Sequence, residues 1–421
     1  MLSHRGQAAS TILETKAVSN AVVVCGGGAA GIATSLAAAR NGAEVWLVEP
    51  RSRLGGTVTH SLIHTLAGIF DSRGQMLQEG LVAELVARLT RGGSARRRRM
   101  GRLWALNVPP EHYEKVVEEW IAELSQITVC RRSVVSKIGL YVRNAREGGR
   151  VASVEVAGPA GPRSLLTDCV VDTTGTGEIV RSIDPRLVQD DRTAAAGLIV
   201  RLRGMTPGML DFPQGLGVVR LLREAADNGT LPASCGQAWI DTGCYPDEAF
   251  VKLLAAISED EAPQRLAAKR QAERDGEAIL GFLKNVRGFS SAKLAQCGEL
   301  GIRDGGRVQG EYVLTKSDVQ QLRKFEDAAC RACWPIEYWD PRQGVSLEYL
   351  PDDGYYEIPL RCLRVKGWSN VWVAGKCLSA DPYAQASARV VGTCWAMGGA
   401  VGRAAVTRRA TTGSANEFAT I

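Results

Sequence analysis

The feature that most restricts the fold is a glycine-rich turn between an apolar segment and an alanine-rich segment. Residues 21–25 read AVVVC, and Gly26, Gly28 and Gly31 follow in the spacing G-x-G-x-x-G. Glycines at this spacing permit a tight strand-to-helix turn, let the backbone approach a pyrophosphate and let the helix pack closely. The N-terminus of that helix supplies amide donors and a favourable dipole for the anion. The pattern therefore predicts a β-α-β unit over residues 21–49 that binds a dinucleotide.

An acidic residue supports this interpretation. Glu49 ends the apolar segment EVWLVE, roughly 20 residues beyond the glycines, where a carboxylate can accept hydrogen bonds from both ribose hydroxyls. The same carboxylate would repel a 2′-phosphate, so NADP is disfavoured. The alternative is an alanine- and glycine-rich helix that packs tightly without a ligand. Strand, glycines, helix and acid agree in order and spacing, which favours dinucleotide binding.

Composition restricts the remaining classes. With 421 residues and 45% hydrophobic content, the chain can bury a large core in two domains or in one domain with a large insertion. It has no run of 18 apolar residues, which argues against a membrane span. The net charge of +6 supports a general attraction to nucleic acid only weakly. Eleven scattered cysteines predict reduced thiols and a cytoplasmic location, and four histidines predict no zinc site.

Several motifs resemble those of a known family. Residues 49–57 (EPRSRLGGT) resemble the acid, spacer and Gly-Gly-x-x-Thr signature of FAD-dependent oxidoreductases related to the fumarate reductase flavoprotein and glutathione reductase-like superfamily. The similarity continues at residues 170–178, 301–319 and 370–405. It covers nearly the whole chain after residue 20. The resemblance implies FAD as the cofactor and an α/β fold, in which a Rossmann-like FAD-binding domain carries an inserted α+β substrate domain.

The resemblance also implies which residues bind FAD. Gly375 is expected near the FAD phosphates and ribityl chain, and residues 389–393 are expected to begin the last helix beside the flavin ring. Asp381 and Pro382 stand where the family commonly has Thr-His, so no histidine with an acid-base role is carried over to this position. The full set of predicted cofactor-binding residues is Gly26, Gly28, Ala30, Gly31, Glu49, Arg51, Arg53, Gly55, Gly56, Thr57, Thr174, Gly175, Gly375, Val391 and Thr393.

The order of the segments predicts the domain organisation. We expect a flexible arm over 1–20, an FAD-binding domain over 21–185 and 351–410, a substrate-binding domain over 186–350 and a flexible tail over 411–421. Within this plan, the patterns predict helices over 111–124, 250–257 and 262–286, and a strand over 194–204.

Four side chains are candidates for catalysis. Arg303 and Arg389 could clamp a substrate carboxylate through paired N–H donors, although either could instead pair with a structural acid. His64 follows the Gly-Gly-Thr segment closely enough to act as a base, but a structural role is the alternative. Tyr383 lies in the C-terminal segment on the flavin side and could assist proton transfer.

Three functions remain compatible with these residues. The first is oxidation of a small organic substrate by hydride transfer to flavin N5, with O2 or an electron-transfer partner as the acceptor. The second is a monooxygenase that uses reduced flavin and O2. The third is an RNA-interacting flavoprotein that binds phosphates through Arg96–Arg99, a basic run that we otherwise expect to be a solvated loop.

Overall fold

Five parallel strands form the centre of the first unit of the fold. The computed structural model describes residues 21–142, 148–190, 194–211, 214–257, 262–340, 344–351 and 354–407, so the predicted arm and tail lie outside the described residues. The strands lie in the order β6-β2-β1-β9-β21. Their bounds are β1 (Ala21–Cys25), β2 (Glu44–Glu49), β6 (Ile127–Arg131), β9 (Arg163–Asp172) and β21 (Val371–Val373). All five residues of β1 are buried, as expected for a central strand covered on both faces.

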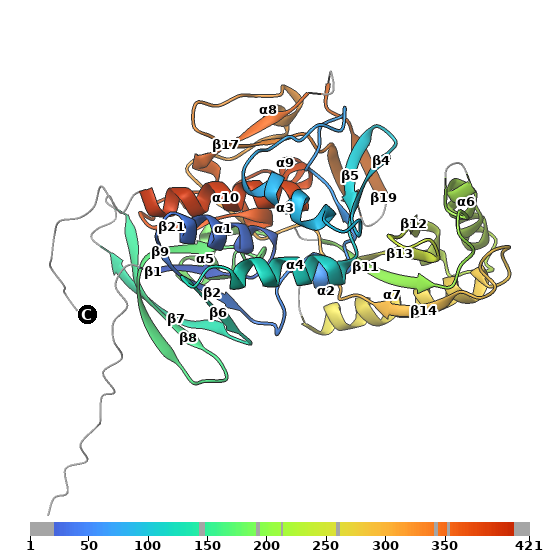
Figure 1. Cartoon of the computed structure of the whole chain (residues 1–421), viewed down its shortest axis with the longest axis horizontal. Helices are drawn as coiled ribbons and strands as arrows, with labels where there is room; N and C mark the ends of the chain where they lie inside the picture. The colour runs from blue at the N-terminus through green and yellow to red at the C-terminus, as the bar shows by residue number, and fades with distance from the viewer. Residues whose placement is uncertain are drawn as a thin grey trace, which may run out of the picture.

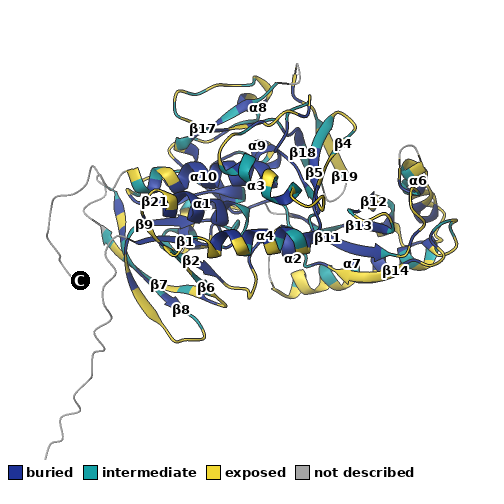
Figure 2. Ribbon diagram, in the orientation of Figure 1, coloured by how far each residue is buried: buried dark blue, intermediate teal, exposed yellow. Residues whose placement is uncertain are grey.

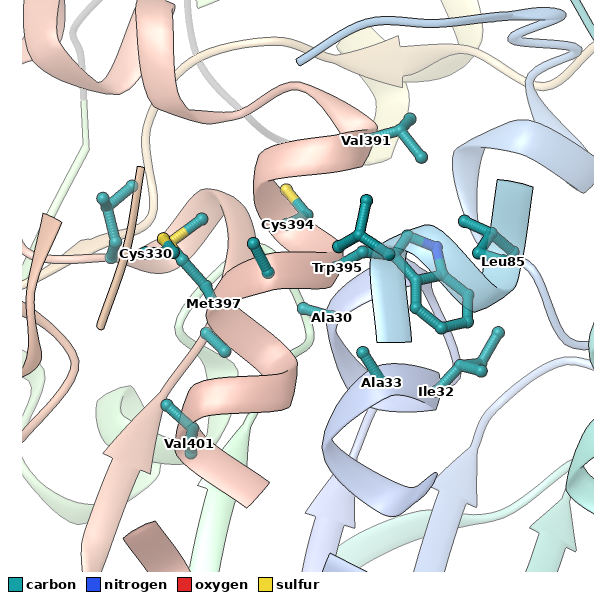
Figure 3. Close-up of a cluster of buried hydrophobic side chains, with 14 of the residues drawn as sticks. Ala30, Ile32, Ala33, Leu85, Cys330, Val391, Cys394, Trp395, Met397 and Val401 are labelled. Atoms are coloured by element: carbon teal, nitrogen blue, oxygen red, sulfur yellow. The ribbon is translucent and has the colours of Figure 1, made fainter. Parts of the chain in front are cut away.

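Two helices from opposite ends of the chain pack together beside this sheet (Figure 1). They are α1 (Ala29–Arg40) and α10 (Val391–Thr407), and Figure 3 shows the small and apolar side chains between them. A Cβ at Gly398 would overlap the carbonyl oxygen of Ala30, so the glycine allows the two backbones to approach closely. The indole ring of Trp395 stacks on Trp120, with ring centroids 5.5 Å apart. The N- and C-terminal segments therefore share one core.

An antiparallel meander extends the sheet on one side. It consists of β7 (Val134–Val142), β8 (Gly149–Ala157) and β9, which also belongs to the parallel part.

Helix α4 (Pro110–Ala122) agrees with the helix predicted over 111–124, and it begins at a proline, as the sequence suggests.

A second unit has its own sheet and core and projects to one side of the first (Figure 1). Its antiparallel sheet has the order β12-β13-β11-β14, and β15 also pairs with β11. The bounds are β11 (Ala194–Arg203), β12 (Trp239–Thr242), β13 (Glu248–Ile257), β14 (Lys293–Cys297) and β15 (Gly301–Ile302), with helices α6 (Gln214–Asp227) and α7 (Ala262–Leu283). Figure 2 shows that the outer side of α7 is exposed.

One predicted helix in this unit is wrong. Residues 250–257 belong to strand β13, which pairs with β11 on one side and β12 on the other. A short apolar run does not distinguish a buried strand from a buried helix by its periodicity, and here the two neighbouring strands decide. The strand predicted over 194–204 and the helix predicted over 262–286 correspond to β11 and α7.

The remaining elements are short. The helices are α2 (Thr57–His60), α3 (Leu81–Thr90), α5 (Glu178–Ile183), α8 (Lys316–Gln320) and α9 (Pro382–Ala388). The strands are β3 (Thr65–Leu66), β4 (Arg96–Met100), β5 (Leu103–Asn107), β10 (Val188–Gln189), β16 (Arg307–Val308), β17 (Ala328–Ala332), β18 (Ile336–Asp340), β19 (Gly344–Glu348) and β20 (Tyr356–Pro359).

The α/β class with a Rossmann-like domain and an inserted α+β unit is confirmed by this architecture. The predicted boundaries at residues 185 and 350 stay predictions, because the segment between them contributes to more than one core: Leu198 and Leu253 pack in the core of the second unit, whereas Leu314 and Ile336 pack with the first. Within the described residues, no helix is both long enough and apolar enough to cross a membrane.

Candidate active site

The glycine turn leaves the start of α1 open to an anion. Gly26 has a φ of +111°, and a Cβ there would lie 2.6 Å from the carbonyl oxygen of Thr173. A Cβ at Gly31 would overlap the carbonyl oxygen of Gly26. Gly28 is the N-cap residue of α1 and supplies no side-chain cap, and the first turn holds no acid. The first amides of α1 are therefore available to a ligand such as a pyrophosphate.

Glu49 brings its carboxylate to the same turn from the end of β2. The residue is only 6% exposed. Its Oε2 accepts a hydrogen bond from the backbone N–H of Gly27 at 2.6 Å, and its Oε1 accepts one from the N–H of Arg51 at 2.9 Å. Because each carboxylate oxygen has two lone pairs, one on each oxygen remains for a ribose hydroxyl.

Three further predicted loops converge on the start of α1. A Cβ at Gly56 would lie 2.8 Å from the Cα of Gly28, so the Gly55-Gly56 loop touches the glycine turn. The hydroxyl of Thr173, which precedes Thr174 and Gly175, donates to the carbonyl oxygen of Gly26 at 2.8 Å. A Cβ at Gly375 would lie 3.0 Å from the Cβ of Ala30. These loops form a cradle without side chains, which fits the close approach that FAD requires.

The other predicted FAD residues in this region are more peripheral. Thr57 begins α2 and is exposed. Arg51 and Arg53 both have carboxylate partners: Arg51 pairs with Glu299, and Arg53 pairs with Glu114 at 3.0 Å. Their predicted contact with FAD stays a prediction.

The start of α10 provides a second helix N-terminus. The helix begins at Val391 and has no acidic residue in its first turn. Thr393 is fully buried, and its hydroxyl has no hydrogen-bond partner among the described residues. A buried hydroxyl without a partner is rare in native proteins and is consistent with a polar group of a ligand at this position. The residues present therefore fit the flavin that the resemblance implies here.

Arg303 and Arg389 lie close together, as the carboxylate-clamp hypothesis requires. Nη1 of Arg303 is 4.0 Å from Oε1 of Glu337, and Nη2 of Arg389 donates to the backbone carbonyl of Glu337 at 3.3 Å. The Arg303 guanidinium lies over the ring of Trp339, 4.1 Å from its centroid. Burial, together with the positive charge of Arg389, lowers the pKa of Arg303 to about 10. Sequence reasoning missed Glu337 and Trp339, because no motif links them to Arg303.

His64 and Tyr383 lie in different environments. Tyr383, on α9, is 41% exposed and contacts Tyr338, with ring centroids 4.9 Å apart. His64 has no exposed surface and stacks on Phe250 at 3.8 Å. Its Nε2 lies 3.7 Å from Oδ2 of Asp241, beyond hydrogen-bond distance. The roles predicted for His64 and Tyr383 stay predictions.

The buried position of His64 predicts a pH-dependent stability. Burial lowers the pKa of His64 to about 4, with a further contribution from Lys252. Because the unfolded chain takes up this proton near pH 6.5, the folded state loses stability as the pH falls from about 6.5 to about 4, by roughly 3 kcal/mol. His64→Phe keeps a ring against Phe250 and removes the titration. The free energy of unfolding of the variant should therefore fall less than that of the wild type over this window, as measured by urea unfolding at several pH values. Equal slopes for both proteins would contradict the assignment.

Glu49 gives a direct test of the dinucleotide site. Glu49→Ala removes the acceptor for the Gly27 amide and for the ribose hydroxyls, so we expect FAD affinity to fall on the order of 10- to 100-fold. Glu44→Ala, on the exposed end of the same strand, is the matched control and should leave affinity unchanged. Fluorescence titration of the apoproteins with FAD measures both. Full FAD affinity in a folded Glu49→Ala variant would exclude the ribose assignment.

The basic run at Arg96–Arg99 is solvated as expected, since three of its four residues are exposed, but it forms strand β4 opposite β5 and not a loop. Arg98 donates to Oδ1 of Asp241 at 2.5 Å, and Arg97 donates to the carbonyl oxygen of Gly74 at 2.7 Å. Arg99 donates to the carbonyl oxygen of Gly101 at 3.0 Å. Three of the four guanidinium groups therefore already have partners in the fold, which leaves fewer donors for phosphates. RNA binding stays an untested alternative.

Metal and disulfide chemistry receive no support from the described residues. All eleven cysteines have free thiols, and the described part of the chain holds no group of three or more His, Cys, Asp or Glu side chains suited to a metal ion. Cys330 and Cys333 are among the free thiols, and burial raises the pKa of both.

Comparison with known proteins agrees with this geometry. A family model described as FAD dependent oxidoreductase matches residues 21–193 and 216–416. No curated protein matches the chain.

The chain is also similar to several solved structures, at low identity. A geranylgeranyl bacteriochlorophyll reductase-like protein from Thermoplasma acidophilum is 12% identical, over 92% of this chain and 77% of its own, with a TM-score of 0.48. Anhydrotetracycline hydroxylase from Streptomyces rimosus is 16% identical, over 93% of this chain and 63% of its own, with a TM-score of 0.46. The p-nitrophenol 4-monooxygenase of Pseudomonas putida is 13% identical, over 93% and 81%, with a TM-score of 0.43. This chain thus spans about three quarters of the first protein and less than two thirds of the second.

The match to the family model covers both ends of the FAD-binding domain, including the glycine turn, Glu49, Gly375 and the start of α10. The chain therefore belongs to the FAD dependent oxidoreductase family, and FAD is its cofactor.

Proposed function

We propose that the protein dehydrogenates a small organic substrate, with a hydride passing from a substrate carbon to N5 of the flavin. The observation that carries the proposal is the start of α10, where a 17-residue helix begins without an acid in its first turn. The positive end of such a helix stabilises negative charge. From the family resemblance we expect this end beside the flavin ring, where negative charge develops at N1 and C2=O on reduction. This arrangement favours acceptance of a hydride.

The chain's own residues are assigned the other tasks. FAD, when bound, supplies the two-electron acceptor. Arg303 and Arg389 orient the substrate. The second hydrogen leaves the substrate as a proton, and Tyr383 is the proposed relay to solvent, because its side chain is 41% exposed at the start of α9. O2 or an electron-transfer partner then takes the electrons from the reduced enzyme.

The proposal is tested by the reaction of the reduced holoprotein with oxygen. The purified protein is photoreduced without oxygen and then mixed with air-saturated buffer, and flavin absorbance follows reoxidation. Slow reoxidation is expected of a dehydrogenase. Fast reoxidation with release of hydrogen peroxide identifies an oxidase instead, which keeps the hydride step and changes the acceptor. Transfer of labelled oxygen into an organic product would replace the proposal with a monooxygenase.

A further inference from the structure

Arg303 and Arg389 are largely buried cations with few partners among the described residues. The only ion pair of Arg303 is with Glu337, at 4.0 Å, and its guanidinium makes no side-chain hydrogen bond among the described residues. The Arg389 guanidinium makes one hydrogen bond among the described residues, at 3.3 Å, and lies 3.8 Å from Oδ1 of Asp304. The Nε atoms of both arginines are inaccessible to solvent and have no partner within the described part of the chain. Buried donors without acceptors destabilise a fold unless a ligand supplies the acceptors.

Arginines with structural roles in the same chain are paired much more closely. Arg201 forms two hydrogen bonds to Glu111, both of 3.1 Å. Arg361, which is about half exposed, forms two to Asp327, of 3.0 and 3.2 Å. These two arginines show the two-pronged pairing that a carboxylate of the fold can offer a guanidinium. Arg303 and Arg389 lack such a pairing among the described residues, which is consistent with a partner supplied by a ligand.

Glu337 lies beside the pair, but its hydrogen bonds go to other donors. Its two carboxylate oxygens accept hydrogen bonds from the indole N–H groups of Trp334 and Trp339, at 2.8 and 2.7 Å. Burial alone would raise the pKa of Glu337, but the two arginines and the two indole donors together hold it below its ordinary value. The carboxylate is therefore ionised and already bonded. It holds the ring of Trp339 beneath the Arg303 guanidinium and so fixes the plane of its N–H donors.

Charged groups of both signs lie around the pair. The carboxylates of Asp304 and Glu337 lie 3.8 Å and 4.0 Å from nitrogens of Arg389 and Arg303, beyond hydrogen-bond distance. The ammonium group of Lys376 donates to the backbone carbonyls of Asp304 and Gly305, on the same segment as Arg303. A carboxylate is the group that a planar guanidinium binds through two N–H donors.

The pair adjoins the predicted flavin site. The side-chain amide of Gln385, on α9, bridges the carbonyl oxygens of Gly305 and Lys376, so the segment after Arg303 is tied to the loop that contains Gly375. Arg389 ends α9 and lies two residues before the start of α10. A ligand held by both arginines would thus lie next to the flavin.

We propose that Arg303 and Arg389 form the binding site for the carboxylate of an organic-acid substrate. This inference rests on the proposed function, because the carboxylate would anchor the molecule whose carbon donates the hydride. It narrows the substrate class to organic acids that present one carboxylate to the arginines, with the reacting carbon directed at the flavin.

The test uses FAD-loaded protein and four probes, namely benzoate, succinate and pyruvate as acids and benzamide as the neutral counterpart of benzoate. Calorimetry measures binding, and the flavin absorbance spectrum reports whether the ligand lies beside the ring. At least one acid is expected to bind and to perturb the spectrum, and benzamide is not. Arg303→Gln and Arg389→Gln should each weaken binding of that acid on the order of 10- to 100-fold. Arg303→Lys, which keeps the charge but loses the planar pair of donors, should weaken it less.

Arg186→Gln is the control, because Arg186 is a surface arginine that pairs with Asp184. It should bind the acid as the wild type does. The FAD content of each variant reports folding. The inference is overturned if no acid binds, if benzamide binds as well as benzoate, if binding leaves the flavin spectrum unchanged, or if folded Arg303 and Arg389 variants keep wild-type affinity. The reoxidation experiment that tests the proposed function contains no organic acid. Its result therefore does not depend on whether Arg303 and Arg389 bind a carboxylate, so failure of the proposed function and failure of this inference are distinguishable.

Discussion

Gly31→Ala is expected to yield a protein without FAD. The added Cβ would overlap the carbonyl oxygen of Gly26, and the atoms that must move are backbone atoms of the glycine turn itself. Helix α1 can escape the collision only by shifting away from the turn, and this shift removes its N-terminus from the pyrophosphate. Overpacking of this kind costs about 3 kcal/mol. The flavin-to-protein ratio after gel filtration should fall to near zero, and the urea unfolding midpoint should fall with it.

A glycine-to-alanine substitution at a second site separates the effect of steric crowding from the effect of helix propensity. Gly281 lies in the exposed part of α7, and a Cβ there meets nothing within 4 Å. Gly281→Ala should retain FAD fully and gain about 0.5 to 1 kcal/mol of stability, because alanine favours a helix more than glycine does. If Gly31→Ala retained FAD at wild-type affinity, the glycine turn could not be the pyrophosphate site.

Arg201→Leu is expected to weaken the contact between the two units. Arg201, on β11, donates to the fully buried Glu248 at 2.5 Å and forms two hydrogen bonds to Glu111 at the start of α4. Removing the arginine leaves the buried charge of Glu248 with a more distant cation, because Nη1 of Arg203 lies 3.6 Å from its Oε1. The expected loss is about 3 kcal/mol, near the low end for a broken buried pair, because Glu248 still accepts the backbone N–H of Cys244 at 2.8 Å. Urea unfolding followed by circular dichroism measures the change.

Two variants identify the cause of that loss. The double variant Arg201→Leu with Glu248→Gln no longer carries the buried carboxylate charge of residue 248. It should therefore be more stable than Arg201→Leu alone. Arg220→Leu breaks an exposed pair with Glu224 on α6 and should not move the midpoint measurably. A double variant less stable than Arg201→Leu would show that lost packing, and not the buried charge of Glu248, causes the loss of stability.

Most residues of the predicted FAD cradle could be found from the sequence because they lie in one local motif. Gly26, Gly31 and Glu49 lie in one β-α-β unit, so their spacing in the sequence fixes their spacing in the fold. Gly375 is more than 300 residues away, and only the family resemblance linked it to them. The structure brings it against Ala30 through the pairing of β21 with β9.

The surroundings of the arginine pair were not predictable in the same way. Arg303 was a candidate from the sequence alone, but Trp339 and Glu337 reach it through side-chain contacts between segments that share no motif. The strand at 250–257 was missed for a related reason, since its two pairing partners, β11 and β12, decide its conformation more than its own composition does.

The shared core of α1 and α10 has a consequence for synthesis. The glycine turn emerges from the ribosome long before β21 and α10, which complete the cradle for FAD. At a usual rate of 5–20 residues per second, this interval lasts roughly 20 to 70 seconds. During that time one edge of β9 lacks its partner β21, and the side of α1 that meets α10 lacks that helix. The cradle for FAD is therefore complete only once α10 has docked on α1.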